Sequence, residues 1–310
     1  MKPNKLIRAI AMYLPQFHPI PENDLWWGKG FTEWSNVTKA KPIFEGQYQP
    51  HIPADLGFYD LRLAETREAQ ADMALFYGIY GFCYYHYWFN GKRLLERPAC
   101  EMQKTGKPDF PFMFCWANEN WSRTWDGGDD VILMRQEYSE NDALEHCRHL
   151  LEYFQDPRYI RIDGRPVFAI YKTQIIPDAV KYIKAFREEA KRANIDLYIL
   201  RFEDHTGTDK EILNHVDASV EFQPQSEMLA RFWKAKEKER VSMGFLHNLY
   251  TRVKTKFMNA DDVQLKKHSL THHLDYEEYV RFVLKNYQYP KNYKRFPGVN
   301  PMWGQYGQKR

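Results

Sequence analysis

Short apolar runs alternate with stretches of helical periodicity along most of this 310-residue chain. Apolar runs without a regular polar face are typical of strands that are covered on both faces. They span residues 6–14, 79–87, 112–117, 166–171, 197–202 and 216–222. Between the first two runs, Leu61, Ala64, Ala71 and Leu75 recur at helical spacing, and Gly78 is placed to end that helix. Alternation of strands and helices predicts a parallel sheet.

Two further helices are predicted from the residues that would begin them. Ser139 and Asp142 match the capping-box pattern, and apolar residues follow at helical spacing up to residue 154. Asp178 can cap a helix whose apolar face continues to residue 190. Both helices lie between predicted strands, as a parallel sheet requires.

The links between the elements differ in length with their direction. Strand-to-helix links are long, at about 18–57 and 118–138, whereas the helix-to-strand link 193–195 is short. Long loops on the carboxyl side of the strands favour a (β/α)8 barrel, whose site is built there. A doubly wound sheet shares part of this pattern, but no GxGxxG follows the first strand, which disfavours dinucleotide binding. We therefore predict one α/β domain of the TIM-barrel type over residues 1–310.

Within that domain we expect two long additions, the first βα loop (about 18–57) and a helical basic insertion (about 226–290). Lysine and arginine interleave with apolar residues over 234–257. One interpretation is an ordinary solvated helix pair inserted in the barrel. The other is a basic amphipathic face that contacts membrane phospholipid or a sugar-diphosphate donor.

Composition narrows the class of protein. The net charge of +3 is too small to indicate a nucleic-acid partner. Four cysteines without CxxC spacing indicate reduced thiols rather than a zinc site, which favours the cytoplasm. No secretory signal is recognised at the start of the chain, and no apolar window has the length of a membrane span. We expect a cytoplasmic protein, with peripheral contact at the inner membrane through 234–257 as an alternative.

The predicted strands end in an unusual set of side chains. The run at 112–117 is followed by two amides, the carboxylate of Glu119 and Trp121. Indole faces stack on the C–H faces of pyranose rings, while amides and carboxylates hydrogen-bond hydroxyl groups. Aromatic residues make up 16% of the chain and recur with Asn, Gln or Glu at the other strand ends. The pattern therefore predicts a carbohydrate site at the carboxyl edge of the sheet.

Glu119 is the candidate catalytic residue, as a proton donor or as a group that orients the sugar. The predicted substrate-binding residues are Tyr13, Gln16, His18, Trp27, Glu33, Trp34, Tyr85, His86, Trp88, Trp116, Asn118, Trp121, Trp125, Glu221 and Gln223. A structural alternative stays open, because polar residues after a strand also cap helices and turns, and His86 can equally be a satisfied core histidine. The residues imply no metal and no organic cofactor.

Six blocks of the sequence resemble a known family. They are MYLPQFHPIPEND (12–24), WWGKGFTEW (26–34), YGFCYYHYWFNGKRLLERP (80–98), FCWANENWSRTWDG (114–127), RYIRIDGRPVFAIYK (158–172) and RFPGVNPMWGQYG (295–307). By these blocks, over essentially its whole length, the chain is similar to the WbsX-type family. This is a glycoside hydrolase family 99-like group from bacterial O-antigen, lipopolysaccharide and capsular polysaccharide clusters.

The resemblance implies a (β/α)8 barrel that acts on glycosidic bonds, because family members are described as glycosyltransferases or as glycoside hydrolases. The better-understood relatives are endo-acting α-mannosidases whose two key glutamates lie in a late motif of the form WNEWxEGxxLEP. No such motif follows the block around Trp303. We therefore expect an incomplete barrel, in which the last βα unit or units and the family glutamate pair are missing.

Three hypotheses for function remain at this stage. The protein forms or cleaves glycosidic bonds of bacterial surface polysaccharide, with an oligosaccharide or a sugar nucleotide as its partner. Alternatively, it binds carbohydrate without catalysis, since the stacking residues are present while the glutamate pair is not. The last hypothesis is an inactive truncated product.

Overall fold

The computed structural model describes residues 7–42, 47–123, 128–203, 211–224, 227–238 and 274–301. By the contacts between its Cα atoms, the chain divides into two compact units. The first comprises Met1–Phe202, Thr208–Val220 and Pro301–Arg310, and the second Glu203–Gly207 and Glu221–Asn300. Each unit is described separately below, and their union in one domain stays a prediction.

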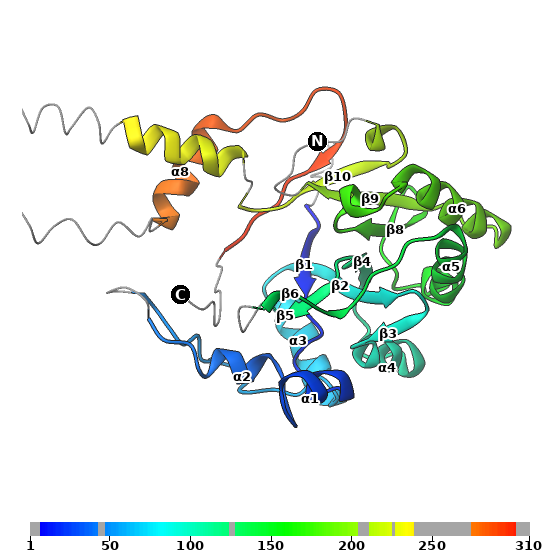
Figure 1. Cartoon of the computed structure of the whole chain (residues 1–310), viewed down its shortest axis with the longest axis horizontal. Helices are drawn as coiled ribbons and strands as arrows, with labels where there is room; N and C mark the ends of the chain where they lie inside the picture. The colour runs from blue at the N-terminus through cyan, green and yellow to red at the C-terminus, as the bar shows by residue number, and fades with distance from the viewer. Residues whose placement is uncertain are drawn as a thin grey trace, which may run out of the picture. The chain divides into compact units, whose positions relative to one another are not determined.

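A mostly parallel sheet forms the first unit (Figure 1). Its strands lie in chain order, β1 (Ala9–Tyr13), β2 (Ile79–Phe89), β4 (Phe112–Trp116), β8 (Arg165–Ile170), β9 (Tyr198–Glu203) and β10 (Ala218–Glu221). The pairs from β1 to β9 are parallel. Consecutive strands that pair with their predecessors are the winding of a (β/α)8 barrel. The predicted barrel-type fold is confirmed, as a curled sheet that does not close among the described residues.

Shorter strands accompany this sheet. β3 (Lys92–Leu94) pairs antiparallel with β2, and β7 (Arg161–Ile162) pairs antiparallel with β8. β5 (Trp121–Arg123) and β6 (Gly128–Met134) form a separate antiparallel hairpin inside the predicted loop 118–138. The first βα loop also has structure of its own, namely α1 (Pro21–Trp27) and α2 (Glu33–Val37).

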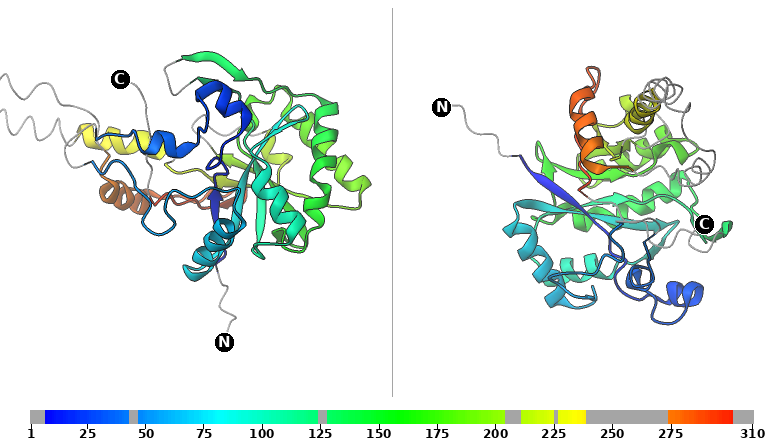
Figure 2. Two further views of the ribbon diagram at one scale, coloured as in Figure 1. Left: turned by 90° about the horizontal axis from the view of Figure 1, so that it is seen from below. Right: turned by 90° about the vertical axis from the view of Figure 1, so that its left-hand side faces the viewer.

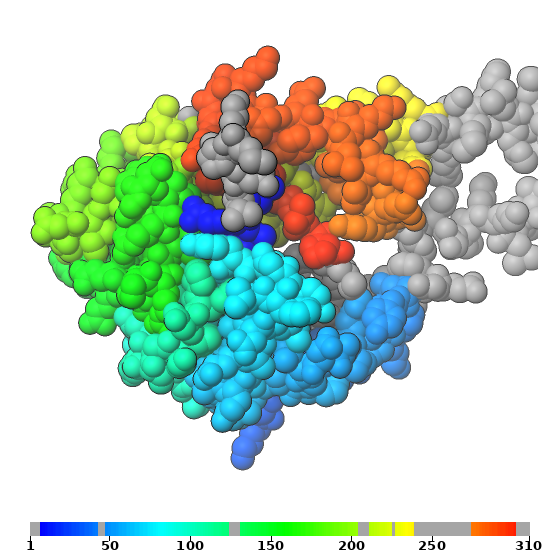
Figure 3. All heavy atoms as spheres, turned by 180° about the vertical axis from the view of Figure 1, so that it is seen from behind, coloured from blue at the N-terminus to red at the C-terminus, as the bar shows by residue number. Residues whose placement is uncertain are grey.

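Helices flank the strands of the first unit (Figure 2). They are α3 (Ala64–Phe76), α4 (Arg97–Thr105), α5 (Glu140–Gln155) and α6 (Ala179–Arg192), with 3-10 turns at Thr173–Ile175 and Ile212–Asn214. Seen from behind, the cyan to yellow-green segments that carry these four helices form much of this unit's surface (Figure 3). Both predicted N-caps are present, because Ser139 accepts from the Asp142 N–H and Asp178 from the Lys181 N–H.

Alternation along β2 assigns its side chains to two environments. Tyr84, His86 and Trp88 meet the helices: the Tyr84 hydroxyl lies 3.8 Å from Sδ of Met102 on α4, and the other two contact α5. Successive side chains of a strand point to opposite faces, so Tyr85 and Tyr87 point the other way. The same strand therefore contributes to the hydrophobic core and to the inner face of the sheet.

The core of the first unit lies between the sheet and α5 and α6. Phe114 packs edge-on against Tyr153 of α5, with ring centroids 5.0 Å apart. Phe168 stacks on Phe186 of α6 at 4.9 Å. Side chains of this size dominate the free energy of burial, at roughly 1.5–3 kcal/mol each. The aromatic composition thus serves the core as well as any ligand.

Gly81 on β2 is a position where the sheet has no room for a side chain. A Cβ atom there would lie 2.6 Å from the carbonyl oxygen of Pro111 and 3.0 Å from Cδ1 of Ile160. Overpacking a rigid site costs about 1–3 kcal/mol. We expect Gly81→Ala to lower the free energy of unfolding by this amount in urea denaturation.

The Gly81 prediction has an internal control. Ile160→Val in the Gly81→Ala background removes the side-chain clash and leaves the main-chain clash with Pro111. It should therefore restore only a small part of the lost stability. Wild-type stability of Gly81→Ala would show that this part of the sheet can move apart.

The described residues of the second unit form two helices, 227–238 and α8 (Tyr276–Asn286), and the short strand β11 (Arg295–Phe296). Met228, Phe232 and Tyr279 form its buried cluster. Within the predicted basic insertion, residues 227–238 and Tyr276–Asn286 are helical, and residues 239–273 lie outside the described part. Of its basic residues, Lys236 pairs with Glu278 of α8. Within the described ranges, none of the helices has the length and apolarity needed to cross a membrane.

Candidate functional site

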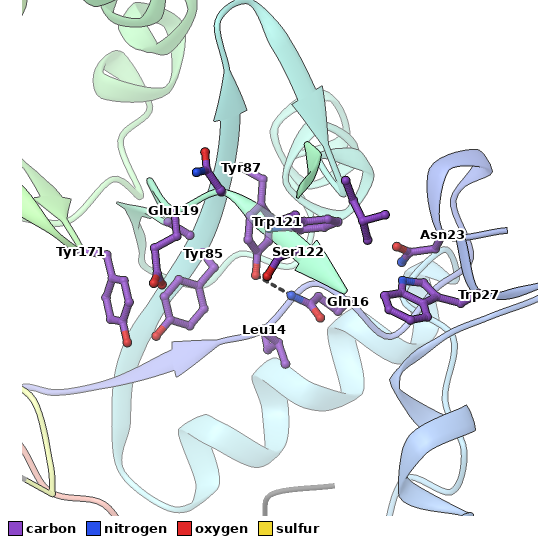
Figure 4. Close-up of a pocket in the computed structure, with 13 residues that line it drawn as sticks. Leu14, Gln16, Asn23, Trp27, Tyr85, Tyr87, Glu119, Trp121, Ser122 and Tyr171 are labelled. Carbon is purple, nitrogen blue, oxygen red and sulfur yellow. Dashed lines mark hydrogen bonds between the residues drawn. The ribbon is translucent and has the colours of Figure 1, made fainter. Parts of the chain in front are cut away.

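A pocket of about 460 Å³ opens at the carboxyl ends of four strands in the first unit (Figure 4). β1, β2, β4 and β8 contribute residues at or just after their ends, and α1 and the β5–β6 hairpin supply the remainder. Its lining residues are Leu14, Gln16, Asn23, Trp27, Tyr85, Tyr87, Ala117, Glu119, Asn120, Trp121, Ser122, Leu133 and Tyr171. The position is the one where barrel enzymes build their sites.

One end of the pocket carries a carboxylate between two phenol rings. Glu119 lies beside Tyr85 and Tyr171, whose rings meet nearly at right angles with centroids 5.8 Å apart (Figure 4). Burial raises the pKa of Tyr85 far above its ordinary value, so this phenol stays neutral and can donate a hydrogen bond. Oε1 of Glu119 lies 2.6 Å from the ammonium of Lys172, and the carboxylate side chain is 43% exposed.

The middle of the pocket is a neutral hydrogen-bonding pair. Nε2 of Gln16 donates to the hydroxyl of Tyr87 at 2.7 Å, as the dashed line in Figure 4 marks. Burial chiefly, and the carboxylates of Glu33 and Glu119 to a smaller extent, raise the pKa of Tyr87. An amide and a phenol in this state offer donors and acceptors without charge.

The other end is formed by indole and amide groups. Trp27 and Asn23 come from α1, and Trp121 comes from the hairpin (Figure 4). Trp121 packs edge-on against Tyr87 at 5.1 Å and against Trp26 at 5.8 Å, which joins the hairpin to β2 and α1. The guanidinium of Arg123 lies 5.6 Å from the Trp27 ring centroid. The pocket thus runs from a carboxylate to the half-buried ring of Trp27.

This arrangement suits a ligand that is polar, uncharged and flat on its faces. Aromatic planes take the apolar faces of such a ligand, while amides and phenols bind its hydroxyl groups. Among the described lining residues, Glu119 is the one charged side chain. A phosphate or polyanion would meet a negative group here, with its lysine counter-ion already engaged.

Five of the predicted site residues line this pocket, namely Gln16, Trp27, Tyr85, Glu119 and Trp121. Trp125 lies outside the described residues. Glu221 and Gln223 belong to the second unit, where the Glu221 carboxylate faces Arg295 at 3.8 Å and accepts from the Gly298 N–H at 3.4 Å. The remaining predicted residues lie in the first unit but do not line the pocket.

Three of them, His86, Trp88 and Trp116, lie in the core on the helix side of the sheet. Nε1 of Trp88 donates to the buried carboxylate of Asp142 at 2.7 Å. Nε1 of Trp116 donates to the carbonyl oxygen of Trp88 at 3.1 Å, and Trp116 is fully buried. Nε2 of His86 lies 3.1 Å from Nε2 of His146.

Hydrogen bonding fixes the tautomers in this part of the core. The Tyr182 hydroxyl donates its one proton to Asp142 at 2.9 Å. The hydroxyl oxygen of Tyr182 also lies 3.3 Å from Nδ1 of His146, so Nδ1 must carry a proton and donate it to this oxygen. Nε2 of His146 is then the acceptor for a proton on Nε2 of His86. His86 and His146 are therefore satisfied core residues.

Four others lie in the N-terminal segment. The Tyr13 hydroxyl donates to Gln70 at 2.6 Å, and Nε1 of Trp34 donates to the Tyr59 carbonyl at 2.8 Å. His18 is buried, and desolvation lowers its pKa to about 4. Glu33 is buried too, and desolvation raises its pKa to about 7.

Asn118 also keeps its polar atoms inside the protein. Its Nδ2 donates to the Lys172 carbonyl at 2.8 Å, and its Oδ1 accepts from the Lys172 N–H at 2.8 Å. The pocket instead contains residues that the sequence patterns did not single out. Tyr87 could have been found as the neighbour two positions from Tyr85 on the same face, and Tyr171 as the last residue of a predicted strand.

The chain is similar to two curated proteins. Two curated proteins from strains of Xanthomonas campestris pv. campestris, each called uncharacterized protein WxcX, are 43% identical to it over 216 residues. That match covers 69% of this chain and 31% of the relatives, so the chain spans about a third of their length.

Solved structures give weaker similarities. A GH99 endo-alpha-mannosidase from Bacteroides thetaiotaomicron has a TM-score of 0.48 at 14% identity, over 76% of this chain and 68% of that one. A glycoside hydrolase-like protein has a TM-score of 0.39 at 18% identity, over 61% and 63% of the two chains. The model of the family described as glycosyltransferase WbsX matches residues 9–310, and the chain therefore belongs to the WbsX family.

Proposed function

We propose that this protein forms or cleaves glycosidic bonds of bacterial surface polysaccharide, with its sugar bound in the pocket of the first unit. The WbsX family supports the carbohydrate class of the ligand. The supporting observation in the structure is the pocket itself, where Glu119 lies between two tyrosines at one end and Trp27 with Asn23 forms the other. An oligosaccharide or a sugar nucleotide would be the partner, in the cytoplasm or at the inner membrane.

The pocket residues divide the recognition of a sugar among them. Trp27 would stack on one ring face, and Gln16, Asn23 and Asn120 would bind hydroxyl groups. Glu119 would contact the reacting sugar, where a carboxylate accepts hydrogen bonds from hydroxyl groups and stabilises positive charge that develops at the anomeric carbon. Transfer and hydrolysis both require such a cleft.

One observation favours a second candidate, a carbohydrate-binding protein without catalysis. Glycoside hydrolysis generally uses two carboxyl groups on either side of the scissile bond. Glu119 is the sole carboxylate among the described lining residues. Product formation from glycosides and sugar nucleotides separates the candidates, because the enzyme should lose turnover at least about 100-fold in Glu119→Gln, whereas a binding protein shows none to lose.

Titration calorimetry with mannose-, rhamnose- and GlcNAc-containing oligosaccharides tests the site itself. We expect Trp27→Ala to weaken binding at least about tenfold, because it removes an aromatic anchor at the mouth of the pocket. Leu25→Ala, on the same helix and 82% exposed, is the matched control and should bind as the wild type does. Equal affinity of wild type and Trp27→Ala would show that the sugar binds elsewhere, and flat titrations on every glycan would refute the proposal.

A further inference from the structure

Asn118 continues the pairing of β4 and β8 beyond the point where the strands end. The last paired residues are Trp116 and Ile170, and the Tyr171 N–H still donates to the Trp116 carbonyl at 3.0 Å. The fully buried Asn118 side chain then makes both main-chain hydrogen bonds of Lys172, each at 2.8 Å. The Asn118 side chain thus replaces the main-chain partner that a further β4 residue would provide, and it holds the Lys172 main chain in place.

The Lys172 side chain returns to the residue next to Asn118. Its Nζ lies 2.6 Å from Oε1 of Glu119 and 5.8 Å from the Tyr171 ring centroid. The Lys172 side chain is only 27% exposed, compared with 43% for the Glu119 side chain. Two neighbouring residues of one strand end therefore hold both the main chain and the side chain of Lys172.

The strand end itself is fixed from the other side. The Tyr138 hydroxyl donates to the Asn118 carbonyl at 2.5 Å, and Oδ1 of Asn120 accepts from the Gln136 N–H at 2.6 Å. Residues 136–138 follow the β5–β6 hairpin, so the segment on both sides of Glu119 is tied to the main body of the unit. Side chains held in this way lose little freedom when a ligand binds.

We propose that Asn118 and Lys172 are positioning residues that fix the Glu119 carboxylate in the pocket. Lys172 is the counter-ion that engages Oε1, and Asn118 places Lys172. In this arrangement Oε2 is left for a ligand hydroxyl, and Glu119 accepts charge-assisted hydrogen bonds instead of donating a proton. That the ligand is a sugar rests on the function proposed above.

A double-mutant cycle on the full chain tests this coupling. Lys172→Met and Glu119→Gln should each weaken binding of the best oligosaccharide about tenfold, and the double variant should be no weaker than Glu119→Gln alone. Lys172→Arg keeps the charge and should stay within about threefold of wild type. Lys181→Met removes an exposed lysine that pairs with Glu140 and should bind as the wild type does.

The outcomes separate the two proposals. If the wild type binds sugar and Lys172→Met binds equally well, or if the two effects add, the positioning role is wrong while the carbohydrate site stands. If the wild type binds no sugar, the rate at which an N-hydroxysuccinimide ester acylates Lys172 still reports on its ion pair with Glu119. Because a lysine held in an ion pair is a poor nucleophile, Glu119→Gln and Asn118→Ala should speed labelling of Lys172 relative to Lys181, and an unchanged ratio would refute the inference.

Discussion

Replacing Trp116 by alanine is expected to lower the free energy of unfolding by about 3–5 kcal/mol, the range for deleting a large buried aromatic side chain. The ring is fully buried and stacks on Tyr182 with centroids 5.1 Å apart. Its Nε1 also bonds the Trp88 carbonyl, whose acceptor would lose a partner. Urea denaturation followed by circular dichroism measures the change.

Trp27→Ala is the matched comparison. Both residues are predicted site tryptophans of the first unit, Trp116 at the end of β4 and Trp27 in the first βα loop. Trp27 is only half-buried, so its loss should change stability by less than about 1 kcal/mol while it weakens sugar binding at least about tenfold. Trp116→Phe should recover part of the stability by refilling the cavity. A Trp116→Ala variant with wild-type stability would contradict the assignment of this residue to the core.

Acidification from pH 7 to pH 5 is expected to destabilise the protein by about 4 kcal/mol. Burial lowers the pKa of His18 and of His149 to about 4, and desolvation lowers the pKa of His86 and of His146 well below the ordinary 6.5. Between pH 6.5 and 4 the unfolded chain therefore binds protons that the folded chain excludes, so acid favours unfolding. For His18 alone, the loss of stability between pH 7 and pH 5 amounts to about 2 kcal/mol.

Buried carboxyl groups act in the opposite direction. Desolvation raises the pKa of Glu33 to about 7, above its ordinary 4.5, so between these values the folded chain binds the proton more readily and acid favours folding. Desolvation also raises the pKa of Asp142. Together the two carboxyl groups cancel the destabilisation that about one to two of the histidines cause, which leaves the net loss of stability stated above.

The free energy of unfolding from urea titrations at pH 7, 6 and 5 checks the acid prediction. Glu33→Gln removes the main opposing group and should steepen the loss, whereas His146→Gln removes one titrating histidine and should flatten it. If the free energy of unfolding of the wild type does not change from pH 7 to pH 5, the buried histidines become protonated in the folded state, and the prediction is wrong.

The strands and their flanking helices could be predicted because their signals are local. Apolar runs gave the strand positions to within a few residues, and Ser139 and Asp178 marked two helix starts that the structure confirms. The β5–β6 hairpin was missed, since Trp121–Arg123 is too short and too polar to show the period of a strand. Its place is set by Trp121 packing on Tyr87, a contact between distant residues.

The site could be predicted only in part, for a reason visible in β2. Tyr84 to Phe89 is aromatic at every position, so the sequence contains no polarity that would distinguish the inner face from the helix side. Tyr85 lines the pocket, whereas His86 and Trp88 pack on α5. After β4, the side chains of the neighbours Asn118 and Glu119 differ in accessibility, because Asn118 is buried and Glu119 reaches the pocket. Only the hydrogen bond of Asn118 to Lys172, which is distant in the sequence, decides which of the two is accessible.

The two-sided use of β2 has a consequence for how this scaffold can change. Odd-numbered tyrosines on the strand touch whatever occupies the cavity, while even-numbered neighbours hold the fold together through α5. Substrate preference can therefore drift at Tyr85 with less penalty to folding than at Tyr87, which is buried and packs on Trp121 of the hairpin. A library randomised at the Tyr85 codon, with His86, Tyr87 and Trp88 kept, is the natural starting material for redirecting the protein toward a different glycan.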